Sequence, residues 1–162
     1  MAKAIVGIGS NVGDRRRHLS KAKSFLAGIS ESAVAASSVY VSEPVGPSER
    51  NFLNAVVALQ TRLSPKDFIR RLKEYEAEHG RPANHPRWSP RTIDLDIIAY
   101  DDLVLREESL VIPHPEYRDR LFVLLPLREL NPGWIDPETS QPIDELVGTA
   151  DSLIIHKTEL CW

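Results

Sequence analysis

The stretch Thr92-Ile93-Asp94-Leu95-Asp96-Ile97-Ile98-Ala99-Tyr100 decides the fold. It is rich in isoleucine and lies between a proline-containing segment and Asp101-Asp102, a pattern that predicts a β-strand. Because the side chains of a strand alternate between its two faces, we expect Asp94 and Asp96 to share one face and the neighbouring apolar residues to share the other. The predicted strand therefore presents two carboxylates on one side and a core surface on the other.

Three further strands are predicted before this stretch, at residues 4–8, 33–41 and 52–63, where the sequence is rich in Val, Ile and Ala. A helix is expected between the first and second strands, and another between the third and fourth. The order β-α-β-β-α-β is the split βαβ arrangement of ferredoxin-like folds. We therefore predict an α/β (α+β) fold with a ferredoxin-like core, in which a mostly antiparallel sheet is covered by helices.

The ends of both helices have recognisable signals. Asp14 is a suitable cap for the first helix, whose apolar residues recur at helical spacing until Gly28, the expected stop. Ser64 is the expected cap of the second helix, with Pro65 at its first position and Gly80 at its end.

The pattern is weaker after the fourth strand, where we expect C-terminal additions to the core. They are a short strand, an extended edge, a helical turn or two around Pro126 and a short final helix, at residues 103–105, 112–115, 121–130 and 143–147. No repeat, low-complexity tract or linker divides the chain. Residues 1–162 are therefore expected to form a single domain.

Composition narrows the classes of function. The 20 Lys and Arg against 23 Asp and Glu give a net charge of -3, so no overall positive field attracts nucleic acid or an acidic membrane. The single cysteine, Cys161, allows neither a disulfide framework nor a thiolate metal site. Residues 1–10 are too short and too little charged to be expected to act as a signal peptide, and no apolar run approaches the roughly 20 residues of a membrane span. We expect a cytoplasmic monomer that binds small molecules, not nucleic acid or membranes.

The two aspartates of the fourth strand are candidate metal ligands. Aspartate is depleted in strands, and two like charges on one face repel, so something positive should compensate them. Paired carboxylates are hard oxygen ligands of the kind that Mg²⁺ takes, usually with substrate phosphates completing its shell. A solvated strand face is the alternative interpretation of an isolated Asp-x-Asp.

The segment before this strand is a candidate lid. Residues 81–91 contain three arginines, three prolines and Trp88, with no apolar periodicity. Arginine binds phosphate through a planar fork of donors, and tryptophan offers a face for stacking. Such a loop beside two carboxylates is typical of a lid over a metal–nucleotide complex, and we expect it to order only when both substrates are bound. A solvated loop with chance arginines is the alternative.

Other residues indicate a small-molecule site less specifically. Asn54 and Phe52 should share a face of the third strand, and an amide beside a ring suits a flat heterocycle, although aromatic residues in strands mostly belong to the core. His114 lies between two prolines, where a lone histidine is more often a structural hydrogen-bonder than a ligand. The sequence has no phosphate-binding P-loop, complete dinucleotide fingerprint, nucleophile elbow, zinc-site spacing or RNA-binding aromatic strand.

Taken together, these segments resemble the 6-hydroxymethyl-7,8-dihydropterin pyrophosphokinases of folate biosynthesis. The matching segments occur in order along nearly the whole chain, at residues 9–11, 38–40, 43–46, 52–55, 80–81, 87–96, 112–115 and 120–122. Residues 91–96 are the most specific part of the match. The resemblance implies a ferredoxin-like fold and transfer of intact pyrophosphate from ATP, the co-substrate, to the pterin hydroxyl, with release of AMP.

The resemblance also implies roles for individual residues. Two magnesium ions that bridge the triphosphate would be held by Asp94 and Asp96. Phosphate oxygens would be bound by Arg81 and Arg91, and the loop that carries Arg87 and Trp88 would close over the site. The pterin would stack between Phe52 and Phe122, with its edge recognised by Asn54, Asp94 and the backbone near Ser42 and Val45. The implied nucleotide contacts are Glu76, Ile97, His114 and Arg120.

Some positions near the implied nucleotide pocket depart from the family pattern. They are Lys73, Ser109, Val111 and Pro115. Two other functions remain open. A metal-dependent phosphate hydrolase would use the same aspartates but would have no use for the heterocycle site. A non-catalytic ferredoxin-like domain that senses a ligand would need no acidic pair facing an arginine loop. No residue stands out as a general base.

Overall fold

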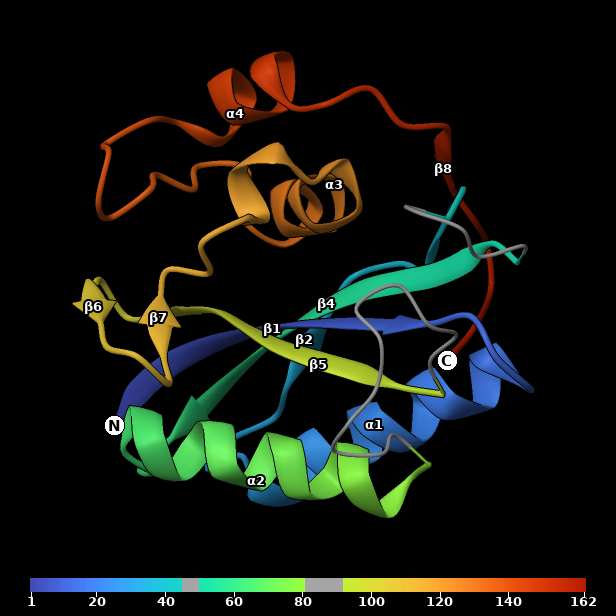
Figure 1. Cartoon of the computed structure of the whole chain (residues 1–162), viewed down its shortest axis with the longest axis horizontal. Helices are drawn as coiled ribbons and strands as arrows, with labels where there is room; N and C mark the ends of the chain where they lie inside the picture. Colours follow the sequence, from blue (N-terminus) through green and yellow to red (C-terminus); the bar gives the residue numbers. More distant parts are fainter. Residues whose placement is uncertain (45–49, 81–91) are drawn as a thin grey trace.

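The computed structural model describes residues 1–44, 50–80 and 92–162 (Figure 1). Within these residues one antiparallel sheet has six strands, and a two-stranded hairpin lies beside it. The sheet contains β1 (Ala2–Ser10), β2 (Ala35–Ala36), β3 (Tyr40–Ser42), β4 (Phe52–Thr61), β5 (Asp94–Tyr100) and β8 (Ile155–Lys157). The hairpin contains β6 (Leu105–Arg106) and β7 (Val111–Ile112). The helices are α1 (Arg15–Ile29), α2 (Pro65–Glu78), α3 (Leu121–Leu130) and α4 (Ile143–Thr149), with a 3-10 turn, η1 (Tyr117–Asp119).

The sheet has the predicted ferredoxin-like connectivity. Its strands follow the order β5-β1-β4-β3-β8, with β2 also paired to β4. In each of the two βαβ units, a strand of the other unit lies between the two strands: β4 lies between β1 and β3, and β1 lies between β4 and β5. Every pairing in the sheet is antiparallel. The predicted α/β fold with a mostly antiparallel sheet is confirmed. C-terminal additions to it are present as α3, α4 and β8.

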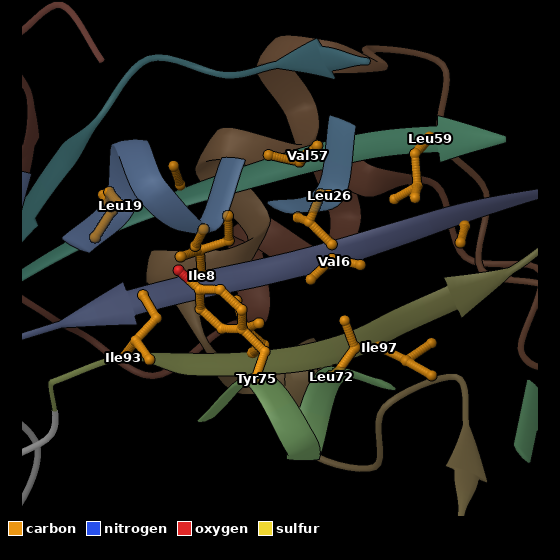
Figure 2. Close-up of a cluster of buried hydrophobic side chains, with 14 of the residues drawn as sticks. Val6, Ile8, Leu19, Leu26, Val57, Leu59, Leu72, Tyr75, Ile93 and Ile97 are labelled. Carbon is orange, nitrogen blue, oxygen red and sulfur yellow. The ribbon is translucent and has the colours of Figure 1, made fainter. Parts of the chain in front are cut away.

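Helices cover both faces of the sheet (Figure 1). On one face, α1 and α2 bury a core in which Leu19, Leu26 and Leu72 pack against the strand residues Val6 and Ile8 (Figure 2). On the other face, α3 and α4 bury a second core, to which the sheet contributes Ile5, Val56, Ile98 and Ala99. No helix in the described parts of the chain has the length and apolarity needed to cross a membrane.

Three of the four predicted helix ends are confirmed. The Asp14 side chain accepts a hydrogen bond from the Arg17 N–H (3.1 Å), and the Ser64 hydroxyl accepts one from the Asp67 N–H (3.2 Å). Gly80, with φ +96°, follows the end of α2. The prediction that Gly28 stops α1 is wrong, because α1 continues to Ile29 and ends where the backbone becomes extended at Ser30.

The predicted single strand at residues 33–41 is also wrong, because it is divided into β2 and β3. Between them, the Ser37 hydroxyl accepts the Val56 N–H (2.9 Å), a ladder position that a backbone carbonyl would otherwise fill. Nearby, the Ser38 N–H donates to the Glu129 carboxylate of α3 (2.7 Å). These side-chain acceptors replace strand partners, so the ladder is interrupted between Ala36 and Tyr40.

The C-terminal half is more regular than predicted. Instead of a helical turn or two, residues 121–130 form the complete helix α3, in which Pro126 is buried between Val123 and Leu127. The short strand expected at 103–105 lies at Leu105–Arg106 and pairs with β7. The strand β8 was not predicted, because its three residues acquire strand structure only by pairing with β3.

Candidate functional site

A cavity of about 400 Å³ lies on the sheet face that α3 covers. Its floor is formed by residues of β1, β4 and β5, and one wall by residues 114–123, which lead into α3. Residues 42–43 and 151–153 form the opposite side. The cavity therefore combines segments that are far apart in the sequence.

The floor is open because glycines occupy its middle strand. Gly9 of β1 lies between Asn54 of β4 and Asp94 of β5 in the sheet register, and Gly7 lies beside Asp96. Residues opposite one another point to the same face, so a side chain at Gly9 would project into the cavity. Its Cβ would lie 3.6 Å from the Asn54 Oδ1 atom. Sequence reasoning missed these glycines, although glycine inside a strand can mark a close approach of a ligand.

One end of the cavity has polar and aromatic groups suited to a flat ring. Asn54 is 3% exposed, and its Nδ2 atom donates to the Ser42 hydroxyl (2.8 Å) and weakly to the Tyr40 carbonyl (3.4 Å). Its Oδ1 atom therefore remains an acceptor at the floor. Phe52 lies beside it, and Phe122 of α3 lines the same cavity. The structure thus brings together four of the residues predicted to bind a heterocycle.

The other end carries the predicted acidic pair. Asp94 and Asp96 both line the cavity, whereas Ile97 is buried in the core on the opposite face, as strand alternation requires. The register of β5 against β1 shifts after Ile97. Ile98, two residues after Asp96, faces the cavity beside the aspartates by the same alternation.

Lys73 of α2 supplies the positive charge that the acidic pair was expected to need. Its Nζ atom lies 3.9 Å from the Asp96 Oδ1 atom and 2.7 Å from the Glu76 Oε1 atom, and it donates to the Leu95 carbonyl (3.3 Å). Burial acts to lower the pKa of Lys73, but the carboxylates of Glu76 and Asp96 outweigh it and raise the pKa. Lys73 is therefore a stable ammonium group.

The four predicted nucleotide contacts do not all reach the cavity. His114 and Arg120 line it. Glu76 is 2% exposed and is paired with Lys73 behind the acidic pair. The Ile97 side chain, in the opposite core, is also outside the lining.

His114 is neutral and has a defined tautomer. Its Nδ1 atom accepts a hydrogen bond from the Glu116 N–H (3.1 Å), which places the ring proton on Nε2. Burial, together with the nearby Arg120 guanidinium, lowers the pKa of His114 to about 4. The side chain is thus an uncharged N–H donor at neutral pH. Arg120 itself pairs with Glu116 through a short ion pair.

An ion pair between the buried Asp136 and the partly buried Arg118 fixes the wall that carries His114 and Arg120. Asp136, which is fully buried, accepts hydrogen bonds from the Tyr117 hydroxyl and from Arg118 (2.5 and 3.1 Å), as well as from two backbone N–H groups. Burial alone would raise the pKa of Asp136, but the Arg118 guanidinium and the other donors outweigh it and hold the pKa well below its usual range. The η1 turn is therefore tied firmly to the segment that follows α3.

The cavity is acidic overall. Six carboxylates line it, against one guanidinium among the lining residues of the described chain, and the acids are Glu43, Asp94, Asp96, Glu116, Asp119 and Asp151. In the same residues no cluster of three or more His, Cys, Asp or Glu side chains is arranged to hold a metal by itself. A polyphosphate would need accompanying cations to enter, because the carboxylates would repel it.

Five of the predicted site residues lie outside the described residues. They are Val45, Arg81, Arg87, Trp88 and Arg91. The lid that residues 81–91 were expected to form therefore stays a prediction.

The fold is a ferredoxin-like α/β domain, and its cavity has an end lined by Asn54 and two phenylalanines, an acidic end, and the neutral His114 on one wall. A family model described as 7,8-dihydro-6-hydroxymethylpterin-pyrophosphokinase matches residues 5–132. Similar proteins carry the name 2-amino-4-hydroxy-6-hydroxymethyldihydropteridine pyrophosphokinase. One, from Synechocystis sp., is 38% identical over 149 residues, which are 91% of this chain and 76% of the relative. Another, from Aquifex aeolicus, is 39% identical over 146 residues and covers 90% of each chain.

A solved structure shows the same fold. The HPPK-DHPS protein of Plasmodium falciparum matches 91% of this chain with a TM-score of 0.69 and 13% sequence identity. The chain spans 44% of that structure's length. From the sequence matches, the chain belongs to the 7,8-dihydro-6-hydroxymethylpterin-pyrophosphokinase family. The resemblance found in the sequence is confirmed, and neither the hydrolase nor the sensor alternative is supported.

Proposed function

We propose how the residues of this cavity perform the family's reaction, in which the chain transfers pyrophosphate from ATP to 6-hydroxymethyl-7,8-dihydropterin. The products are AMP and the pterin diphosphate ester, an intermediate of folate biosynthesis. One observation carries the assignment. The residues Phe52 and Asn54 and the acidic residues Asp94 and Asp96 face one cavity on either side of Gly7 and Gly9 of β1, which carry no side chain. Both substrates can therefore meet above β1.

In this proposal the pterin occupies the end of the cavity at Asn54. The ring stacks between Phe52 and Phe122, and the Oδ1 atom of Asn54 accepts a hydrogen bond from the ring edge. Asn54 is preorganised for this, because its Nδ2 atom is already held by the Ser42 hydroxyl (2.8 Å). We also assign the backbone of Val45 to recognition of the ring edge, as the family resemblance implies.

The triphosphate occupies the acidic end. Enzymes of this family use ATP and depend on magnesium in general. The carboxylates of Asp94 and Asp96, adjacent on one strand face, are oxygen donors that fit this hard cation, and we assign two ions to them. Bound magnesium supplies neutralisation of phosphate charge and lowers the pKa of a coordinated hydroxyl. The phosphates of ATP complete the ligand set, so the cavity needs no third protein ligand.

The chain's own residues position the reacting groups. The Nε2–H group of His114 donates to a phosphate oxygen, and Arg120 adds charge from the same wall. The pterin hydroxyl gives up its proton to solvent as its oxygen attacks the β-phosphorus in line. The new oxygen–phosphorus bond forms, and the bond from the β-phosphorus to the oxygen that bridges it to the α-phosphorus breaks, so that AMP leaves with that oxygen. We assign Arg81 and Arg91 to phosphate oxygens, and Arg87 and Trp88 to a lid that excludes water. Glu76 acts through Lys73, and Ile97 contributes only backbone atoms to the nucleotide site.

A product assay tests the assignment. The protein is mixed with ATP, Mg²⁺ and the reduced hydroxymethylpterin, and the nucleotide product is identified. AMP is expected, whereas ADP or free phosphate would contradict the reaction. Asp96→Ala should keep the fold and lose several orders of magnitude in turnover, since the charge neutralisation it supports is worth several kcal/mol in the transition state. Turnover within about tenfold of the parent protein would show that the metal assignment is wrong.

A further inference from the structure

One side of the cavity comes from a part of the chain beyond the family match. The family model ends at residue 132, but residues 151–153 line the cavity. They belong to the stretch that leads from α4 into β8, drawn in red in Figure 1. We call residues 151–157 the C-terminal strap.

The strap is bound to the strand that carries Ser42. In the β3–β8 pairing, Ser42 lies opposite Ile155. The pairing continues one residue further, because the Glu43 N–H donates to the Ile154 carbonyl (3.0 Å) and the Ile154 N–H donates to the Glu43 Oε1 atom (3.1 Å). At the other end of the strap, the Lys157 Nζ atom lies 3.5 Å from the Glu129 Oε1 atom of α3. The strap is thus held on two sides of the site.

The pairing determines which strap side chains face the cavity. Ser42 lines the cavity, and residues paired across a sheet point to the same face, so Ile155 has the orientation of Ser42. Alternation gives Leu153 that orientation too, and gives Ile154 the opposite one. Both expectations agree with the structure, since Leu153 is half-buried and lines the cavity, whereas Ile154 is 71% exposed.

We propose that Leu153 is a specificity-determining residue, which forms an apolar side of the pterin subsite and limits the substituents that the ring can carry. The inference rests on the proposed function, because it places the ring at Asn54. The hydrogen bond from Asn54 to Ser42 spans β4 and β3, and the strap is the next strand. Leu153 therefore stands across the ring from the acidic pair, on the side away from the triphosphate.

Ligand titration of the whole protein tests this role. The probes are 6-hydroxymethyl-7,8-dihydropterin and its 2-methylamino derivative, whose added methyl group lies at the end of the ring opposite the hydroxymethyl group, each added with a non-hydrolysable ATP analogue and Mg²⁺. Leu153→Ala is expected to weaken binding of the parent pterin about fivefold, because apolar contact is lost. Relative to its affinity for the parent pterin, the variant is expected to bind the 2-methylamino derivative better than the unmodified protein does. The Kd of the ATP analogue should not change.

Two further variants make the outcome decisive. Ile154→Ala is the matched control, because this neighbouring side chain points away from the cavity, and it should bind both pterins as the parent protein does. Asn54→Ala reports on the ring site itself. Unchanged pterin binding and unchanged discrimination against the 2-methylamino derivative in Leu153→Ala, with weaker binding in Asn54→Ala, would overturn the role of Leu153 alone. Unchanged binding in both would overturn the ring site as well.

Discussion

Replacing Gly9 by alanine is expected to obstruct the cavity floor without disturbing the fold. Gly9 does not have the positive φ found at Gly13 and Gly80, so alanine fits its backbone. The added Cβ would lie 3.6 Å from the Asn54 Oδ1 atom and 3.7 Å from the Phe52 ring, which are ordinary contact distances. Alanine is also favoured over glycine in a strand by about 0.5–1 kcal/mol. The free energy of unfolding should therefore stay the same or rise by about that amount.

The same methyl group should impair pterin binding, because it stands where the ring would lie over β1. If it prevents the ring edge from reaching Asn54, a buried hydrogen bond is left unmade, at a cost of about 1–3 kcal/mol. The Kd for the pterin should then rise by about 5- to 150-fold. Titration with the pterin in the presence of an ATP analogue measures this change, and thermal unfolding checks the fold.

Gly28→Ala is the matched control for this substitution. Gly28 lies within α1, and a Cβ there would meet nothing within 4 Å. It should gain up to about 1 kcal/mol of stability and bind the pterin normally. Pterin affinity of Gly9→Ala within about twofold of the parent protein would refute the assignment of the ring to this floor.

Three other predictions concern charges near the site. Lys73→Gln should bind Mn²⁺ about fivefold more tightly than the parent protein in the absence of nucleotide, because the half-exposed Lys73 ammonium, 3.9 Å from the Asp96 carboxylate, competes with the cation. Arg70→Gln, on the same helix, is the control and should leave the metal affinity unchanged, and electron paramagnetic resonance of free Mn²⁺ measures both affinities. Asp136→Ala should lower the free energy of unfolding by about 3 kcal/mol, since the buried Tyr117 hydroxyl loses its acceptor and the partly buried Arg118 guanidinium keeps only Glu138 (3.2 Å), and a loss below about 1 kcal/mol in urea unfolding would contradict this. The lowered pKa of His114 should make stability fall as pH drops from about 6.5 to about 4, because the unfolded chain takes up the proton first; His114→Gln should lack that slope in unfolding curves.

Features that depend on short-range periodicity were predictable from the sequence. The two-residue period of a strand was enough to predict that Asp94 and Asp96 lie on the opposite face of β5 from Leu95. The same period predicted that Phe52 and Asn54 lie on one face of β4. Helix caps were equally accessible, because a cap contacts an amide only three residues away. These local rules gave the βαββαβ order and hence the fold.

Features that depend on tertiary contacts were not predictable in this way. The positive charge beside Asp96 was expected, but its source is Lys73, on a helix that precedes β5 by many residues. The break at Ser37 depends on a hydroxyl that meets β4, and β8 exists because it finds the free side of β3. The importance of Gly9 follows from the sheet register, which places it between two functional side chains.

The position of the acidic pair on β5 has a consequence for how copies of the protein behave in solution. In the described part of the chain, β5 forms one edge of the sheet, and an edge strand is a place where a strand of another molecule can join. Charged side chains along an edge strand discourage two sheets from joining into a continuous one. In addition, the Lys73 ammonium group donates a hydrogen bond to the Leu95 carbonyl (3.3 Å). The carboxylates assigned to metal binding therefore also protect the sheet from edge-to-edge aggregation.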